Sequence, residues 1–269
     1  MVRSSRVLSL VSFLIVASTM GGLDAHAEAP AKRAKKAAAA PATTEAIHAE
    51  KTADAPKASE AATPKAADAK GKLPDAQVAA EVARVQAIYE KVRAFRARFK
   101  QDYWVKAYDQ RKKSAGLVVF ARPGKMSWTY DEPKGNRVVS DGKLLRVYEE
   151  ASKQLYEQPV DKSQYPQALG FLTGETKLAE TFTFEGNDGA AMSFPGGIVL
   201  VATPKQPLAT VQKVLLYVDA ATHYVRRVLL LDAQGNRNRF DFEDVKLDDA
   251  LDLREFTFVA PPGTSVIHP

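Results

Sequence analysis

The stretch FRARFKQDY, from Phe95 to Tyr103, indicates the kind of fold that this chain adopts. Apolar or uncharged side chains stand at every second position of the stretch, beginning with Phe95. Charged residues occupy the alternate positions: Arg96, Arg98, Lys100 and Asp102. Because successive side chains of a strand point to opposite faces, this period of two predicts a β-strand with one buried and one solvated face.

The residues before Phe95 follow the helical period instead. Asp75 stands in a position to cap a helix, and apolar residues follow at spacings of three and four. These residues are Val78, Val82, Val85, Ile88, Tyr89 and Val92. We therefore predict one amphipathic helix from about 75 to 93, directly before the first strand.

Beyond Tyr103 the chain consists mostly of short alternating runs separated by turn residues, at a spacing typical of antiparallel sheets and barrels. We predict strands near 112–122, 125–130, 136–140, 143–149, 153–159, 180–186, 197–203, 210–219, 223–232, 236–246 and 253–259. The segment from Ser163 to Thr173 differs, because its apolar residues Tyr165, Ala168, Leu169 and Leu172 fall on one helical face. We expect this short inserted helix to cover an open side of the sheet.

Residues 1–27 have the features of a secretory signal peptide. Arg3 and Arg6 precede an apolar run from Val7 to Thr19, and Ala25-His26-Ala27 has the small-x-small form of a cleavage site. The apolar run is shorter than the roughly 18 to 20 residues that a membrane-spanning helix needs, so a retained anchor is the weaker alternative. We expect cleavage after Ala27 and, because the chain has no cysteine, an exported protein without a lipid anchor.

Residues 28–72 differ sharply in composition from the rest, since 18 of these 45 residues are alanine. Such a segment cannot bury enough apolar area to offset the entropy of ordering it. It contributes +3 to the net charge of +6 and the signal segment contributes +1, which leaves +2 for the domain at 73–269. We interpret residues 28–72 as a disordered, solvated spacer, with a basic arm that contacts anionic lipid or peptidoglycan as the alternative. The weak charge of the domain argues against binding to nucleic acid.

The alternation also predicts which side chains share one face. If the sheet curls, its concave side carries Phe95, Phe99, Val118, Phe120, Met126, Trp128, Tyr130, Tyr148, Val214, Leu216 and Val218. This surface is either packed solid or lines a cavity for an apolar ligand. The pattern alone favours the packed core, because protein interiors are normally filled.

The predicted domain lacks the residues that most enzyme chemistry requires. Apart from His268 at the terminus, His223 is its only histidine, and the chain has no cysteine. We therefore expect no catalytic residue, metal site or cofactor, and we interpret His223 as a solvated turn residue. Acidic residues alternate with aromatic ones or lie in a turn, which is typical of a solvent face: Asp241, Glu243, Asp244, Asp248, Asp249 and Asp252. A weak calcium site or a carboxylate-based envelope hydrolase remains an alternative without support of its own.

Four short motifs together point to a known family. They are Phe95-x-Ala97-x-Phe99-x-Gln101, the run RPGKMSW from Arg122 to Trp128, the run VSDGK from Val139 to Lys143 with Tyr148, and Phe256-x-Phe258-x-x-Pro261-x-Gly263. In this order, from about Leu73 to the end, the chain resembles the family of periplasmic outer-membrane lipoprotein carriers, LolA. The resemblance implies a mainly β fold with an α lid, in which an incomplete, half-open antiparallel barrel is covered by the N-terminal and inserted helices.

The same resemblance implies a function and its partners. The carrier would take the acyl chains of triacylated lipoproteins into an apolar cavity lined by the concave set. It would act in the periplasm as a monomer, receive lipoproteins from an inner-membrane ABC-type releasing complex and pass them to an outer-membrane receptor lipoprotein. That receptor is anchored through a lipidated cysteine, so the absence of cysteine favours the soluble carrier.

By resemblance, Arg122 occupies the position of an arginine that bonds to the lid and holds it shut. Tyr165, Leu169 and Leu172 would belong to the lid helix, and Met126 stands where the family often has phenylalanine. A solvated cation before a turn is the alternative for Arg122. An exported barrel that binds free lipid or senses lipoproteins, without delivering them, is the alternative function.

Overall fold

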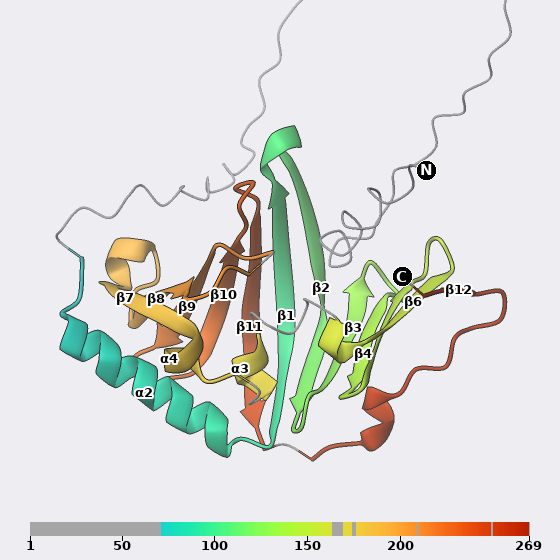
Figure 1. The fold of residues 1–269 in the computed structure, drawn as a ribbon, viewed down its shortest axis with the longest axis horizontal. Helices are drawn as coiled ribbons and strands as arrows, with labels where there is room; N and C mark the ends of the chain where they lie inside the picture. Colours follow the sequence, from blue (N-terminus) through green and yellow to red (C-terminus); the bar gives the residue numbers. More distant parts are fainter. Residues whose placement is uncertain (1–70, 163–168, 174–175, 209, 249, 269) are drawn as a thin grey trace, which may run out of the picture. The chain divides into compact units, whose positions relative to one another are not determined.

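Twelve strands form a single sheet in the computed structural model of this protein (Figure 1). The structure describes residues 71–162, 169–173, 176–208, 210–248 and 250–268, so the predicted signal peptide and nearly all of the spacer lie outside it. In chain order the strands are β1 (Ala94–Val105), β2 (Gln110–Ala121), β3 (Lys125–Glu132), β4 (Arg137–Asp141), β5 (Leu144–Glu149), β6 (Gln154–Pro159), β7 (Phe182–Asp188), β8 (Gly197–Pro204), β9 (Lys213–Asp219), β10 (Val225–Leu231), β11 (Arg237–Leu247) and β12 (Ser265–Ile267).

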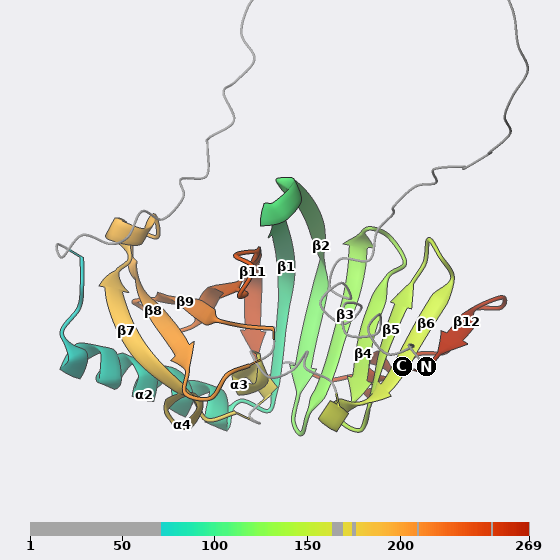
Figure 2. The ribbon, with the colours of Figure 1, turned by 45° about the horizontal axis from the view of Figure 1, so that its top comes forward.

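The order across the sheet is β12-β6-β5-β4-β3-β2-β1-β11-β10-β9-β8-β7 (Figure 2). All neighbours pair antiparallel except β12 and β6, which are parallel. The first and last members, β12 and β7, do not pair with each other, so the sheet is open. This confirms the predicted mainly β fold with an incomplete, largely antiparallel barrel.

The alternation predicted from Phe95 onward is confirmed in β1. Phe95, Phe99 and Gln101 are buried, whereas Arg98 and Lys100 are exposed. In the register of the sheet, Phe99 lies beside Phe242 of β11 on one side and Gly116 of β2 on the other. The two faces of the sheet are therefore distinct, and the buried face of β1 continues across its neighbours.

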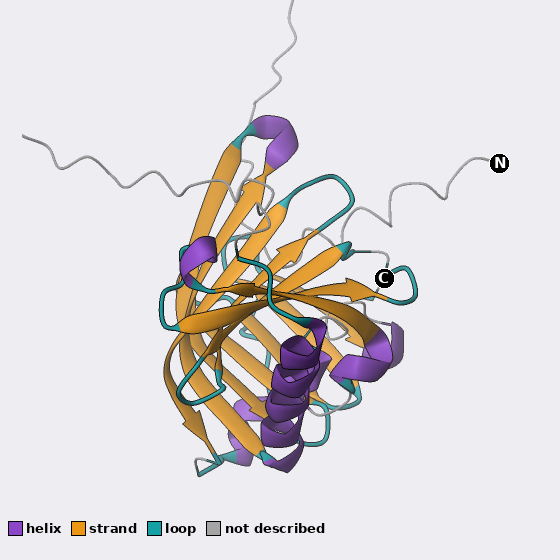
Figure 3. Ribbon diagram, turned by 90° about the vertical axis from the view of Figure 1, so that its left-hand side faces the viewer, coloured by secondary structure: helices purple, strands orange, loops and turns teal. Residues whose placement is uncertain are grey.

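Three α-helices are described: α2 (Asp75–Lys91), α3 (Gly170–Thr173) and α4 (Leu178–Thr181). The α2 helix lies along the concave side of the curled sheet (Figure 3) and buries the predicted stripe that includes Val78, Val82 and Val85. Pro74 occupies the N-cap position, so Asp75 is the first helical residue and not the predicted cap. Its carboxylate is still well placed for the positive end of the helix dipole. No helix among the described residues is long and apolar enough to cross a membrane.

The strand predicted near 253–259 is wrong. Leu253–Phe256 form a 3-10 turn, and the last strand, β12, begins only at Ser265, beyond Pro261-Pro262-Gly263. Phe256 packs against Val119 and Ala121, and the ring of Phe258 contacts that of Tyr148. Two aromatic residues spaced by two resemble a strand in sequence, but here they anchor an irregular segment to the face of the sheet.

Gly116 allows β1, β2 and β3 to approach closely. A Cβ atom at this position would lie 2.0 Å from the Thr129 carbonyl oxygen and 2.9 Å from Cε1 of Phe99. Because the first contact is with backbone, side-chain movement cannot relieve it. We expect Gly116→Ala to lower the free energy of unfolding by about 1 to 3 kcal/mol, measured by urea denaturation. A change within about 0.5 kcal/mol, as at an ordinary surface site, would contradict this account of the packing.

Candidate functional site

The concave face brings together nearly all the apolar residues that the sequence predicted to share a face. None of them is more than 6% exposed, and they form one contiguous core with residues of α2 and α3. The residues are Phe95, Phe99, Val118, Phe120, Met126, Trp128, Tyr130, Val214, Leu216 and Val218.

Trp128 lies at the centre of this concave core. Its ring centroid is 4.8 Å from that of Phe99, 5.3 Å from that of Phe240 and 5.8 Å from that of Phe120. The contacts with Phe99 and Phe120 are edge-to-face, an arrangement that aromatic pairs prefer. The rings therefore fill the space between the strands that carry them.

Tyr148 does not belong to the concave core, contrary to the prediction. Leu145 and Val147 of β5 are the residues that join it. Tyr148 is adjacent to Val147 in the strand and therefore points to the opposite face, where its ring lies 5.1 Å from that of Phe258. The prediction assigned the wrong set of alternating β5 residues to the concave face, because the two faces of this strand are nearly equally apolar.

Arg122 connects the sheet to the end of α2. Its Nη2 donates a hydrogen bond of 2.5 Å to the backbone carbonyl of Tyr89, in the last turn of the helix. In a longer helix this carbonyl would accept from the N–H of Arg93, but that N–H donates to Asp248 Oδ1 at 2.7 Å. Arg122 thus supplies a donor to a carbonyl that the helix leaves without an intrahelical partner.

The Tyr89 side chain attaches the same end of α2 to the sheet and to α3. Its hydroxyl accepts a hydrogen bond of 3.1 Å from the backbone N–H of Val225, and burial raises the pKa of this hydroxyl, which keeps it neutral. Its ring lies 5.4 Å from that of Phe171 in α3. Leu169 and Leu172, which the prediction assigned to a lid helix, are buried in the same core, while Tyr165 lies outside the described residues.

A buried carboxylate on α2 was missed by the sequence reasoning. Glu81 is 1% exposed, its Oε1 lies 2.8 Å from Nδ1 of His223, and its Oε2 accepts from Nη1 of Arg84 at 3.1 Å. His223 does lie in a turn, between β9 and β10, but its ring contacts α2 and is not simply solvated. The position of Glu81, three residues after Val78 and four before Val85, was the available signal, because it places an acid in the apolar stripe.

An apolar groove of about 480 Å³ lies between α2, α4 and β7. The helix contributes Ala79, Ala83 and Ala87 to its wall, and β7 contributes the rings of Phe182 and Phe184. The spacing of these three alanines is visible in the sequence. The groove itself could not be predicted from it, because the opposite wall is formed by β7, about 100 residues later in the chain.

Two acidic residues of β11 form ion pairs across the sheet. Asp241 pairs with Arg227 and with Arg239, and Glu243 pairs with Lys100 at 2.7 Å. Within the described part of the chain, no group of three or more His, Cys, Asp or Glu side chains is arranged to hold a metal ion.

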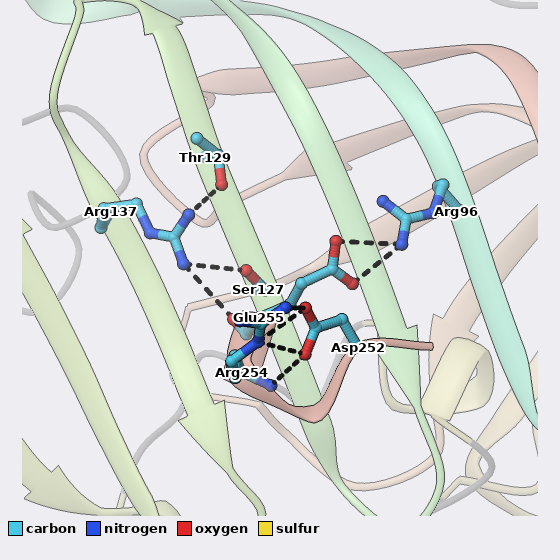
Figure 4. A network of polar contacts seen from close by, with 7 residues as sticks. All are labelled: Arg96, Ser127, Thr129, Arg137, Asp252, Arg254 and Glu255. Atoms are coloured by element: carbon cyan, nitrogen blue, oxygen red, sulfur yellow. Dashed lines mark hydrogen bonds and ion pairs between the residues drawn. The ribbon is translucent and has the colours of Figure 1, made fainter. Parts of the chain in front are cut away.

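The segment after β11 lies on the face of the sheet that carries Arg96, Thr129 and Arg137 (Figure 4). This face is the convex one, because the strand neighbours Phe95 and Trp128 point into the concave core. Nη2 of Arg96 donates to both carboxylate oxygens of Glu255, at 2.8 and 3.0 Å. Nη2 of Arg137 donates to the Glu255 carbonyl at 3.3 Å, and Nη1 of Arg137 donates to the hydroxyl of Thr129. Together with the burial of Phe256, these contacts keep the C-terminal segment away from the concave core.

Comparison of sequences relates this chain to proteins described as outer-membrane lipoprotein carriers. The family model for the outer membrane lipoprotein carrier protein LolA matches residues 90–259. An outer-membrane lipoprotein carrier protein from Pseudomonas aeruginosa is 30% identical over 200 residues, which cover 73% of this chain and 91% of that protein. A protein of the same name from Nitrosomonas europaea is 26% identical over 196 residues, or 73% of this chain and 93% of that protein.

Solved structures include a LolA superfamily protein from Nitrosomonas europaea, with a TM-score of 0.37 and 14% identity, covering 66% of this chain and 97% of that one. The family assignment rests on the sequence matches. Since the family model spans more than half of the chain, and the Pseudomonas relative is matched over nine tenths of its length, this chain belongs to the LolA family of outer membrane lipoprotein carrier proteins.

Proposed function

We propose that this protein is a periplasmic carrier that binds the acyl chains of lipoproteins between the concave face of the sheet and the helices α2 and α3. One observation carries the proposal. A largely apolar concave face lies beneath a helix whose end is attached to the sheet by an arginine bonded to a single backbone carbonyl. The residues that would line the opened cavity are Phe95, Phe99, Val118, Phe120, Met126, Trp128, Tyr130, Val214 and Leu216.

The physical need for such a cavity follows from the chemistry of acyl chains. Each methylene group moved from an apolar medium into water costs about 0.8 kcal/mol, so a lipoprotein cannot cross an aqueous compartment with its chains exposed. A protein cavity replaces the membrane during the crossing. This role makes and breaks no covalent bond, so it requires no catalytic residue.

Ligand entry requires movement, because the rings of the concave core contact one another when α2 is in place. Arg122 is the residue proposed to hold the lid shut in the empty protein. Its bond to Tyr89 is of the charge-assisted kind, worth about 1.5 to 3 kcal/mol, which is strong enough to bias the lid and weak enough to yield to an acyl chain.

We further propose that the carrier acts as a monomer, receives triacylated lipoproteins from an inner-membrane ABC-type complex and delivers them to an outer-membrane receptor lipoprotein. Family membership supports this route. The predicted signal peptide and the absence of cysteine support an exported carrier without its own lipid anchor.

A binding measurement tests the proposed function. We expect a triacylated lipopeptide with one fluorescent acyl chain to bind the protein with a stoichiometry of one and to be displaced by unlabelled lipopeptide. Free fatty acid and phospholipid should compete at least tenfold less well, because they present fewer chains to the cavity. Equal competition by phospholipid would indicate a general lipid-binding protein and would contradict the carrier proposal.

A further inference from the structure

The contact between Glu81 and His223 joins α2 to the sheet at a second place. Glu81 lies eight residues before Tyr89, which corresponds to about 12 Å along a helix. The two attachments therefore act on different halves of α2. Arg122 holds the C-terminal end, and the β9–β10 turn, through His223, holds the N-terminal half.

The turn that carries His223 is rigidly built. The Asp219 carboxylate accepts hydrogen bonds from the N–H groups of Ala221 and Thr222 and from the Thr222 hydroxyl. The His223 N–H donates to the Asp219 carbonyl at 2.8 Å, and its backbone is left-handed, with a φ of 57°. From this uncommon backbone conformation the imidazole of His223 reaches Glu81 on α2.

A carboxylate at this place is not what packing alone would select. Removing a charge from water is costly unless it is paired, and an apolar residue of similar volume often serves stability equally well. The Glu81 carboxylate is compensated by two polar contacts, one with His223 in the β9–β10 turn and one with Arg84 on its own helix. Of these two contacts of Glu81, only the one with His223 joins α2 to the sheet, and these are the two parts that the proposed opening of the lid would separate.

We propose that Glu81 and His223 form a second latch of the lid, and that the charge on His223 sets how readily α2 leaves the sheet. This inference rests on the proposed function insofar as the opening of α2 admits a ligand. Histidine is the side chain whose charge ordinarily changes between pH 5 and 8. A carboxylate binds a protonated imidazole more strongly than a neutral one, so the proposal predicts a tighter latch wherever the imidazole carries a proton.

The other charged groups around the pair keep their charge in this range. Arg84 remains a cation on α2, and Arg226 of β10 lies near Asp219. Hydrogen bonds from Thr222 lower the pKa of Asp219, so this carboxylate is already ionised well below neutral pH. A pH response between 6 and 8 is thus expected to come from the imidazole.

Hydrogen exchange of the α2 amides in the ligand-free full chain tests the latch directly. After correction for intrinsic exchange rates, we expect the wild-type helix to open about fivefold more often at pH 8 than at pH 6. Glu81→Gln and His223→Gln should each remove this dependence, and the double variant should behave like either single one. Glu90→Gln, on the exposed side of the same helix, is the matched control and should keep the wild-type response.

A further variant distinguishes the loss of the pH response from misfolding of the protein. Glu81→Leu fills the same place with an apolar side chain, so it should keep α2 packed while removing the pH response. A pH response that persists in Glu81→Gln, in Glu81→Leu or in His223→Gln would overturn the proposal.

Uptake of the fluorescent triacylated lipopeptide provides the functional readout. The wild-type uptake rate should rise from pH 6 to pH 8, and the rate of the His223→Gln variant should not. If the lipopeptide does not bind at either pH while α2 keeps its pH-dependent exchange, the proposed function fails and the latch stands. If the lipopeptide binds but the exchange of α2 does not depend on pH in the wild type, the latch is wrong and the carrier function stands.

Discussion

Replacing Arg122 by leucine is expected to leave the protein loaded with acyl ligand and to slow its release by roughly 10- to 150-fold. The bond from Arg122 to the Tyr89 carbonyl exists when α2 lies on the sheet, so it stabilises the arrangement that we propose as the closed, empty state. Without this bond the open, loaded state is favoured by about 1.5 to 3 kcal/mol, which converts to the stated factor. Leucine also adds apolar surface beside Val118 and Phe120, which share the face of Arg122.

The measurement is the transfer of a fluorescent triacylated lipopeptide from preloaded protein to phospholipid vesicles. Arg122→Lys is expected to give an intermediate rate, because the ammonium keeps the charge but loses the planar geometry of the guanidinium. Arg93→Leu is the matched control, since the side chain of Arg93 is exposed and only its backbone contacts Asp248. Release from Arg122→Leu at the wild-type rate would show that this arginine does not control the lid.

Replacing Trp128 by alanine is expected to lower the free energy of unfolding by about 3 to 5 kcal/mol. This ring is completely buried and contacts Phe99, Phe120 and Phe240 at once. Its removal leaves a cavity bordered by the rings of these three residues, which belong to β1, β2 and β11. Urea denaturation, followed by far-UV circular dichroism, measures the change.

Trp104, the other tryptophan of the chain, is the matched control. It is partly exposed, donates from Nε1 to Asp109 at 2.8 Å and lies beneath the guanidinium of Arg237. A surface cation–π contact is worth about 0.5 to 1 kcal/mol, so Trp104→Ala should cost far less than Trp128→Ala. Equal costs for the two variants would mean that the concave core is not the main source of stability.

The sequence predicted those parts of the fold that depend on local periodicity. The change of period at Phe95 located the end of α2 and the start of β1 within a few residues. The alternation in β1, β2 and β3 also assigned the concave residues of those strands correctly. Such predictions succeed because one buried and one solvated face produce a clear pattern along a single strand.

Periodicity gave wrong predictions where the apolar residues of a segment do not mark one buried face of a strand. Tyr148 lies in a strand with apolar residues on both faces, so nothing local distinguishes the face of Val147 from that of Tyr148. Phe256 and Phe258 have the spacing of a strand, but they are side-chain anchors that pack on the convex face. In both cases the deciding neighbour is far away in the sequence.

The contacts that hold α2 could not be predicted from the residues for the same reason. Glu81 and His223 are 142 positions apart, and Arg122 is 33 positions from Tyr89. The role of Arg122 was suggested only by resemblance to a family, and the pairing of Glu81 was not suggested at all. An acid within an apolar stripe predicts that some partner exists, but the three-dimensional fold is needed to identify it.

Native mass spectrometry of the protein purified from the periplasm of its own cells tests the carrier function most directly. The predicted result is a population of protein with one bound triacylated polypeptide, which dissociates when the acyl chains are removed. Recovery of the protein with bare phospholipid or fatty acid, and never with an acylated polypeptide, would contradict the central claim.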